Sequence, residues 1–442
     1  MKYTALLLSL LFAVTTDAKE PVALRMVLAG VEKEYPNLLE LYKHLHAHPE
    51  LSLHEDKTSQ RVAEELRRIE GIEVTTNVGG YGVVGVFKNG SGPTVLVRCD
   101  LDGLPVKEQT GLPYASVAMT KDDWGKEVPV MHACGHDVHM TSLIGTARVL
   151  TQLKEQWSGT IVFIGQPAEE RVGGAKMMLA DGLFTRFPKP DYCLALHDAA
   201  DLPAGTVGYV PGFALANVDS VDITVRGVGG HGAYPHTTKD PIVLAAEIVV
   251  ALQTIVSREI QPGEPAVVTV GSIQGGTKHN IIPDEVKLQL TLRSYAEEVR
   301  QQTIAAVKRI VHGQALSTGV PENRLPEVKF SEDYTPSTYN EPKLTQRLAG
   351  AWENWLGATN VIKAKPTMGG EDFSQYSRTP EKIPSCIFWV GAVEPKLFAE
   401  SKKTGNPLAS LHSPYFAPVV EPTIKTAITA MCASVLELTG KK

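Results

Sequence analysis

Residues 134–170 read CGHDVHMTSLIGTARVLTQLKEQWSGTIVFIGQPAEE and contain one helix-and-strand unit with polar residues at both ends. The stretch 136–156 predicts a helix. The short apolar run 159–165, bounded by glycines, predicts a buried strand. Cys and His side chains precede the helix, and two Glu side chains follow the strand. This stretch therefore predicts both a piece of an α/β fold and a place where chemistry occurs.

The same alternation continues on both sides of this stretch. Strands are predicted at residues 72–77, 83–87, 94–98, 191–196 and 206–210, with helices at 22–46, 57–69 and 175–180. Residues 332–442 again combine helices and a strand of this kind. Helices are predicted at 342–356, 372–377 and 422–438, and a strand at 387–390. Such alternation predicts an α/β layer architecture with a largely parallel central sheet.

Residues 217–331 follow a different pattern. Strands are predicted at 218–226, 266–270, 286–293 and 327–330, with helices at 240–258 and 297–312. The order β-α-β-β-α-β is that of small ferredoxin-like α+β domains. We therefore expect two domains, a catalytic α/β domain made of residues 19–216 and 332–442 and an inserted domain of residues 217–331.

Composition narrows the class of protein. A chain of 442 residues exceeds what one hydrophobic core usually covers, which agrees with two domains. A net charge of −6 with 43% hydrophobic residues indicates a globular protein and argues against a binder of nucleic acid, which would normally be basic. Five scattered cysteines do not indicate a disulfide framework.

The N-terminus has the pattern of a secretory signal. Lys2 precedes an apolar run at residues 5–14, and small residues around Ala18 offer a cleavage site. The run is too short for a membrane-spanning helix, and we expect no membrane span elsewhere. A buried N-terminal helix is the alternative. We therefore predict that residues 1–18 are a signal peptide and that the mature protein is periplasmic or secreted.

Cys134 and His136 flank Gly135, so a tight backbone bend can aim both side chains at one point. Thiolate and neutral imidazole are favoured ligands of zinc and related divalent ions. His132 and His139 are two further candidates nearby. These residues alone would also fit a structural zinc site.

Glu169 and Glu170 follow the predicted strand 159–165 directly. Ligands of open α/β sheets bind at the carboxyl ends of strands. Neighbouring side chains diverge there, so one carboxylate can ligate a metal while the other holds a proton. A solvated acidic turn is the alternative interpretation of such a pair.

Three more candidates stand near ends of strands or in loops. His197 closes the predicted strand 191–196, and His412 lies in a loop before the last helix. Asp100 follows the predicted strand 94–98 by two residues, and a carboxylate at that place can orient a ligating imidazole. A lone histidine at such a position is more often structural, and that is the alternative for both.

Five motifs in one order resemble the amidohydrolase branch of the aminoacylase and carboxypeptidase metallopeptidase family. They lie at residues 98–105, 134–137, 167–170, 230–236 and 369–373. That branch includes hippurate hydrolases and plant auxin-conjugate hydrolases. The resemblance runs over residues 38–438, nearly the whole predicted mature chain.

The resemblance implies a role for each candidate. It implies two divalent metal ions, zinc or manganese first and cobalt or nickel also compatible, bridged by Cys134. The other ligands would be His136, Glu170, His197 and His412. Glu169 would be the general base, and Asp100 would orient a ligating imidazole. His132 and His139 would then be supporting residues and not ligands.

The resemblance also gives roles to the inserted domain, as a lid and as the interface of a homodimer or higher homo-oligomer. His231 would reach the partner subunit's active site and stabilise the oxyanion, which is often worth about 3 kcal/mol. Asn280 and Arg293 would bind substrate. Alternatives are an incidental His in a flexible turn and a surface ion pair for Arg293.

We therefore predict metal-dependent hydrolysis of N-acyl or N-aroyl amino acids, which yields a carboxylic acid and a free amino acid. A dipeptidase or carboxypeptidase of the same family is the nearest alternative. A metal-binding module without catalysis and a thiol redox protein using Cys134 are the more distant ones.

Overall fold

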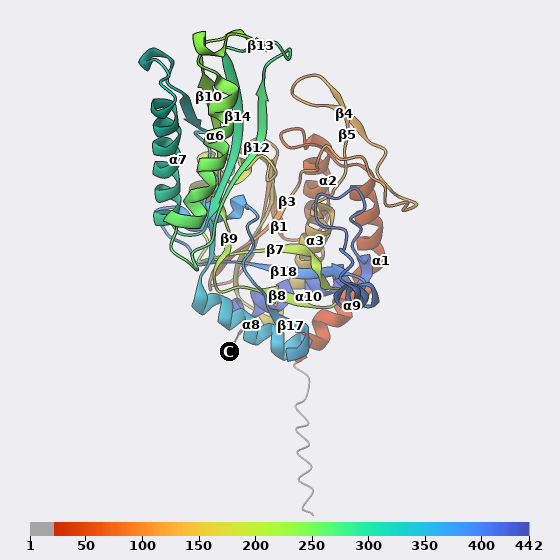
Figure 1. Ribbon diagram of the computed structural model, residues 1–442. Helices are drawn as coiled ribbons and strands as arrows, with labels where there is room; N and C mark the ends of the chain where they lie inside the picture. The colour runs from red at the N-terminus through yellow and green to blue at the C-terminus, as the bar shows by residue number, and fades with distance from the viewer. Residues whose placement is uncertain (1–21, 442) are drawn as a thin grey trace, which may run out of the picture.

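The computed structural model describes residues 22–441, so the predicted signal peptide lies outside the described residues. A sheet of eight strands forms the centre of the larger unit (Figure 1). Its strands, in spatial order, are β1 (Ile72–Val78), β2 (Gly82–Asn89), β6 (Gly159–Gln166), β3 (Thr94–Asp100), β7 (Tyr192–Pro203), β18 (Ser385–Val393), β8 (Val207–Tyr209) and β17 (Val361–Lys363). The four central strands β6, β3, β7 and β18 run parallel, which confirms the predicted α/β class.

Helices cover both faces of this sheet. One face packs against α1 (Val22–Ala47), α2 (Asp56–Arg67), α3 (His136–Gln152), α8 (Pro342–Leu356) and α10 (Val420–Thr439). The other face carries α4 (Gly174–Ala180), α5 (Leu183–Arg186) and the 3-10 helix η6 (Asp372–Arg378). The strands read as continuous apolar runs because both faces are buried: Val95 and Val97 enter the first core, and Leu96 enters the second.

A second, smaller α+β unit is built from residues within the range 217–330. Its four antiparallel strands, in spatial order, are β12 (Ala266–Gly275), β14 (Glu285–Ser294), β10 (Asn217–Arg226) and β15 (Glu327–Phe330). The helices α6 (Pro241–Thr254), which continues as the π-helical turn η3 (Ile255–Glu259), and α7 (Glu297–Ser317) pack on one face. Strand β10 alternates buried and exposed residues because only this face is covered.

Short elements complete the described chain. They are the hairpin β4 (Met119–Lys121) and β5 (Glu127–Pro129), the pair β9 (Gly212–Leu215) and β16 (Thr338–Asn340), the pair β11 (Gly230–His231) and β13 (Ile281–Ile282), the helix α9 (Pro395–Thr404), and the 3-10 turns η1 (Lys154–Gln156), η2 (Pro235–Thr237), η4 (Glu322–Arg324) and η5 (Ala358–Asn360). No sequence pattern predicts the hairpin, β17 or α9, because each is short and largely exposed. The predicted helix 136–156 is interrupted, since α3 ends at Gln152 and a separate 3-10 turn follows.

One helix of the described residues, Pro241–Glu259, is long and apolar enough to cross a membrane by length and composition alone. Its buried side chains, among them Leu244, Ile248 and Leu252, belong to the core of the smaller unit. The same test is passed by core helices of proteins without a membrane span. This helix is therefore weak evidence for a span.

Candidate metal centre and active site

Three neighbouring parallel strands of the large sheet deliver polar side chains to one place. Asp100 is the last residue of β3, Glu169 and Glu170 follow the end of β6, and His197 lies in β7. The spatial order β6-β3-β7 makes these strands adjacent. The convergence that the strand-end rule predicts is therefore present in the structure.

Cys134 reaches the same place from the loop before α3. Gly135 adopts the left-handed conformation, with φ +74°, and α3 begins at His136. The Sγ atom of Cys134 lies 3.5 Å from Nε2 of His197 and 3.2 Å from Nε2 of His412. The glycine thus makes the bend that the sequence predicts, and the thiol sits between two imidazoles that are distant in sequence.

The five predicted metal ligands form two overlapping groups of three. Cys134, His136 and His197 make one group, and Cys134, Glu170 and His412 make the other, with the ligand atoms of each group within 4.8 Å of one another. Cys134 belongs to both groups. This arrangement suits a pair of metal ions that share one thiolate.

The histidines of the first group present a free nitrogen to this centre. The Nδ1 of His136 donates to the backbone carbonyl of Asp102 at 2.7 Å, and the Nδ1 of His197 donates to that of Asp198 at 2.7 Å. Each bond fixes the tautomer in which Nε2 carries the lone pair. Among the described residues, the buried Nε2 of His136 and Oε1 of Glu170 have no hydrogen-bond partner. Buried polar atoms without a partner are costly, so a cation fits here.

The thiol of Cys134 also requires a cation to act as a ligand. Burial, followed by the negative charges of Glu170 and Glu169, raises the pKa of this thiol well above its usual value. Only the thiolate binds metal, and a bound divalent ion deprotonates a coordinating thiol. The donor set of thiol, imidazoles and carboxylate therefore fits two divalent metal ions.

Glu169 lies beside the ligand groups but is held in a different environment from Glu170. Burial, and then the negative charges of Glu371, Glu170 and Asp372, raise the pKa of Glu169 well above its usual value. A carboxyl whose pKa is raised can exchange a proton near neutral pH. The two adjacent carboxylates can therefore have the different roles expected from the sequence, Glu170 as a metal ligand and Glu169 as the group that carries a proton.

A fully buried arginine ties the strand ends together. Arg98 donates to Asp100 at 2.7 Å, to Glu371 at 2.8 Å and to Asp372 at 3.2 Å. Its Nε also donates to Gln166, the last residue of β6, at 3.1 Å. The motif at residues 369–373 thus serves two purposes, because its glycines line a cavity while its carboxylates neutralise Arg98.

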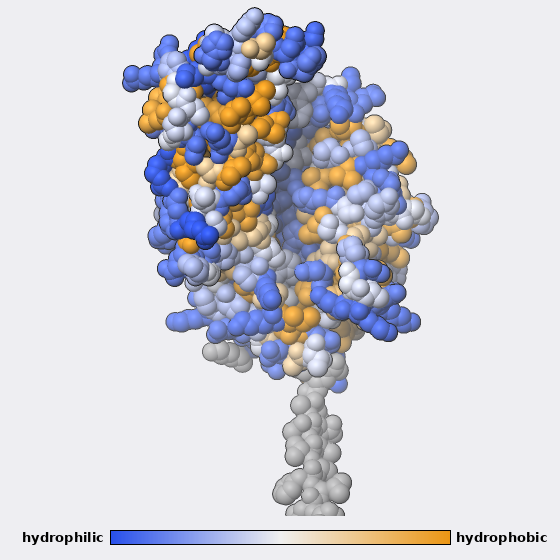
Figure 2. All heavy atoms as spheres, in the orientation of Figure 1, coloured by the Kyte–Doolittle hydropathy of each residue, from blue (hydrophilic) through white to orange (hydrophobic). Residues whose placement is uncertain are grey.

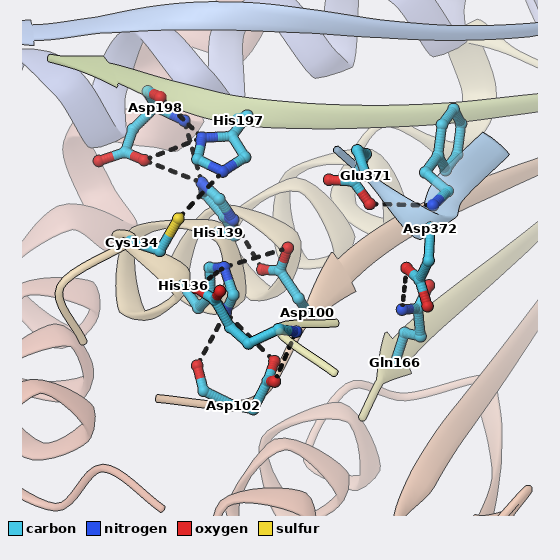
Figure 3. Close-up of polar contacts among 12 residues, drawn as sticks. Asp100, Asp102, Cys134, His136, His139, Gln166, His197, Asp198, Glu371 and Asp372 are labelled. Carbon is cyan, nitrogen blue, oxygen red and sulfur yellow. Dashed lines mark hydrogen bonds and ion pairs between the residues drawn. The ribbon is translucent and has the colours of Figure 1, made fainter. Parts of the chain in front are cut away.

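His139 supports the centre and is not one of the five predicted ligands (Figure 3). Its Nδ1 donates to Asp100 at 2.7 Å, and its Nε2 accepts from the backbone N–H of Asp198 at 2.9 Å. Asp198 follows His197 directly in the sequence and is fully buried. Asp198 was not predicted, although a carboxylate next to a candidate ligand was a usable signal.

His46 holds the start of α3 from the side of α1. Its Nδ1 donates to Asp137 at 2.7 Å and its Nε2 to Glu108 at 3.0 Å. Burial lowers the pKa of His46, but these two hydrogen bonds outweigh burial and raise it to about 10. Asp137 in turn accepts from the N–H of Val138 at 2.9 Å. The imidazolium therefore fixes the helix that begins at His136.

A cavity of about 700 Å³ opens over the ligand groups. Its walls come from both units, for example Trp389 and Leu411 from the larger one and Val218 and Arg293 from the smaller one. Figure 2 shows the groove between the two units. Arg293 is half-buried, donates to the carbonyl of Met368 at 2.7 Å, and is the one Lys or Arg among the lining residues. The cavity thus combines apolar walls with a cation.

His231 and Asn280 do not line this cavity in the described chain. His231 is exposed in β11, which pairs with β13 at the end of the smaller unit far from the large sheet (Figure 1). The carbonyl of Asn280 accepts from the N–H of Gly232 at 2.9 Å, so the two predicted residues share one loop cluster. Their predicted roles require a movement of this unit or a second subunit.

Comparison of this sequence with those of known proteins identifies the family to which the chain belongs. Residues 96–432 match Peptidase family M20/M25/M40. The chain belongs to this peptidase family. It is 36% identical to the N-acetylcysteine deacetylase of Bacillus subtilis, over 81% of this chain and 88% of that protein. It is 37% identical to thermostable carboxypeptidase 1 of Saccharolobus solfataricus, over 80% of this chain and 85% of that protein.

A solved M20 structure has a similar fold. The YxeP protein of Bacillus subtilis, described as a dinuclear metal-binding peptidase, superposes with a TM-score of 0.72 and 30% identity, covering 92% of this chain and 99% of that one. Family and site geometry agree. The chain is a metal-dependent amide hydrolase of the M20 family, as the sequence predicted.

Proposed function

We propose that this M20 hydrolase cleaves the amide bond of N-acyl or N-aroyl amino acids, releasing a carboxylic acid and a free amino acid. The single observation that carries the proposal is the cavity that unites the ligand groups, Glu169, apolar walls and Arg293. The apolar walls suit an acyl or aroyl group. The guanidinium of Arg293 suits the α-carboxylate of the amino acid, since Arg pairs well with carboxylates.

The metal ligands would be Cys134, His136, Glu170, His197 and His412. Two divalent ions held by them would acidify a water molecule and polarise the amide carbonyl. Zinc and manganese suit this mixed donor set best, and cobalt and nickel are compatible with it.

Glu169 is the proposed general base. Its carboxylate lies close to His136 and Glu170, and burial with surrounding negative charge raises its pKa, which makes the carboxylate a stronger base. It would take a proton from the attacking water and deliver that proton to the leaving nitrogen, which must be protonated to depart as an amine. Asp100 would hold Arg98 and His139 in place and would not itself react.

A substrate panel tests the proposal. Metal-replete protein is assayed with N-benzoyl amino acids, N-acetyl amino acids and dipeptides, beside the Glu169→Gln variant. We expect the acylated amino acids to be the better substrates and Glu169→Gln to lose nearly all turnover while it keeps its metal. Full activity of Glu169→Gln would remove Glu169 from the role of base.

A carboxypeptidase is the second candidate, because one relative at 37% identity has that name. N-acyl amino acids and peptides share the scissile amide, so both fit the same centre. Faster hydrolysis of the dipeptides would favour this second candidate.

The smaller unit supports a homodimer in this proposal. The outer face of α6 exposes Ile242, Val243 and Val250, and the edge strand β12 exposes Ile273. Figure 2 shows apolar side chains gathered on the smaller unit. Pairing of this face between two copies would cover these residues and could bring His231 of one subunit to the cavity of the other. Light scattering of the wild type and of Val250→Glu tests this, since a charge there should produce monomers.

We also propose that the protein is exported, on the basis of the signal pattern at residues 1–18. N-terminal sequencing of the protein from a periplasmic or secreted fraction tests this location. A mature chain that still begins at Met1 would exclude cleavage.

A further inference from the structure

Glu55 is a buried carboxylate that takes no part in the ligand groups. It lies just before α2, and its side chain is completely inaccessible to solvent. Its Oε1 accepts a hydrogen bond from the backbone N–H of Ala168 at 2.7 Å. Its Oε2 is buried and has no hydrogen-bond partner in the described part of the chain. A buried carboxylate normally needs several hydrogen-bond partners, so this arrangement destabilises the folded protein. A contribution to stability therefore does not explain why Glu55 is there.

The amide that Glu55 holds belongs to a strained turn. Ala168 has a φ of +50°, a conformation that costs a residue with a side chain about 1–2 kcal/mol. Its carbonyl accepts from the N–H groups of Gly173 and Gly174 at 3.2 and 3.3 Å. Strained residues persist where the surrounding contacts determine them and are concentrated at functional sites. The residue that follows this turn is Glu169.

The amide on the other side of Glu169 is held in the same way. The N–H of Glu170 donates to Oδ2 of Asp102 at 3.0 Å, and the hydroxyl of Ser52 donates to the same oxygen at 2.6 Å. Ser52 and Glu55 lie three residues apart on the segment between α1 and α2. One segment therefore holds the peptide group before Ala168 directly through Glu55, and the peptide group between Glu169 and Glu170 by way of Asp102.

We propose that Glu55 is a positioning residue, whose carboxylate fixes the Ala168 amide and thereby aims the side chain of Glu169. The inference rests on the role of Glu169 in the proposed function. Glu55 acts on the backbone and touches neither substrate nor metal. The acceptor oxygen is what matters, so an amide side chain should serve in its place and a methyl group should not.

The test compares Glu55→Ala and Glu55→Gln in the metal-loaded full chain. Misplacement of a reacting group by about 1 Å can cost about 100-fold in rate. We expect Glu55→Ala to lower kcat about 10- to 100-fold with little change in KM or bound metal, and to shift the acid limb of the pH profile of kcat/KM. Glu55→Gln should stay within about threefold of wild type, because its Oε1 still accepts from Ala168.

Glu50→Ala is the matched control on the same segment. The Oε2 of Glu50 accepts from the N–H and hydroxyl of Thr58 at 2.8 and 2.9 Å, so it caps α2, and within the described residues its side chain makes no hydrogen bond to the loop of Glu169. We expect it to lower the unfolding temperature and leave kcat unchanged. A kcat for Glu55→Ala that falls no further than that of Glu50→Ala would overturn the proposal. So would a Glu55→Gln variant as slow as Glu55→Ala.

Ala168→Gly keeps the inference testable even if Glu55→Ala does not fold. Glycine removes the strain at φ +50° but loosens the turn. We expect this variant to be at least as stable as wild type in unfolding of the metal-free protein, yet several-fold slower in kcat. An unchanged kcat would count against a strained, positioned turn. Failure of the proposed function looks different, since Glu169→Gln would then retain activity.

Discussion

The bend at Gly135 gives the sharpest test of how the metal ligands are presented. Gly135 has φ +74° and ψ 19°, and it separates Cys134 from His136. A Cβ added there would lie 2.1 Å from Oδ2 of Asp198 and 2.4 Å from its Cγ. Asp198 has little freedom to retreat, because it is buried and its Oδ1 lies 3.2 Å from Nε2 of His139. Gly135→Ala should therefore disturb both metal groups.

The loss of unfolding free energy expected for Gly135→Ala has two separable contributions. The left-handed conformation costs a residue with a side chain about 1–2 kcal/mol. Forcing an extra carbon into a packed site typically costs about 1–3 kcal/mol more. We therefore expect Gly135→Ala to lower the free energy of unfolding by about 2–5 kcal/mol. Gly405→Ala is the control, because Gly405 has φ +77° and ψ 5° but nothing within 4 Å of its added Cβ.

Denaturant unfolding of the metal-free proteins measures these values, and elemental analysis after dialysis measures retained metal. Gly405→Ala should lose about 1–2 kcal/mol and keep its metal. Asp198→Ala in the Gly135→Ala background should recover the steric part of the loss. If Gly135→Ala and Gly405→Ala are equally stable and bind equal metal, the close approach of Asp198 does not constrain the bend, and the reasoning is refuted.

Three further predictions concern groups around this bend. The pKa of His46 is raised to about 10 in the folded protein, above its unfolded value of 6.5, so its stabilising effect should be complete below pH 6.5 and disappear as pH rises through 10. Wild type should lose on the order of 5 kcal/mol over that range and His46→Gln should not, as followed by urea unfolding at each pH. Arg98→Met leaves three buried carboxylates without their cation and should cost about 3–5 kcal/mol, and a loss below about 1 kcal/mol would show that they are neutral when the protein is folded. Cys134→Ala should weaken both metal sites and His412→Ala one of them, so isothermal titration with zinc should separate the two variants. Equal stoichiometry for both would contradict a shared thiol.

The parts of this site that the sequence predicted are those attached to regular strands. Asp100, the Glu169–Glu170 pair and His197 could be placed together because parallel strands bring their carboxyl ends to one edge. The bend before α3 could be predicted from Gly135 alone. The resemblance supplied the role of His412 as a ligand, because nothing in an irregular loop indicates which strand ends it will approach.

The parts that the sequence did not predict depend on contacts between distant segments. His139 lies three residues after His136 on the same helix, and only the packing of α3 against β3 shows that Asp100 accepts the hydrogen bond from its Nδ1. Glu55 was missed because its partner is a backbone amide more than a hundred residues away. The positions of His231 and Asn280 depend on how the smaller unit, or a second chain, meets the cavity.

The two ligand groups differ in how firmly the fold holds them, and this difference bears on how the centre is assembled. Cys134, His136 and His197 come from a strand and a helix start, and hydrogen bonds fix the tautomers of both imidazoles. In the second group, His412 lies on an irregular loop with φ +65° and a side chain that is half exposed. A ligand on a loop loses more conformational freedom when it binds. The first group should therefore take its metal more tightly, and the second ion should be the one that exchanges.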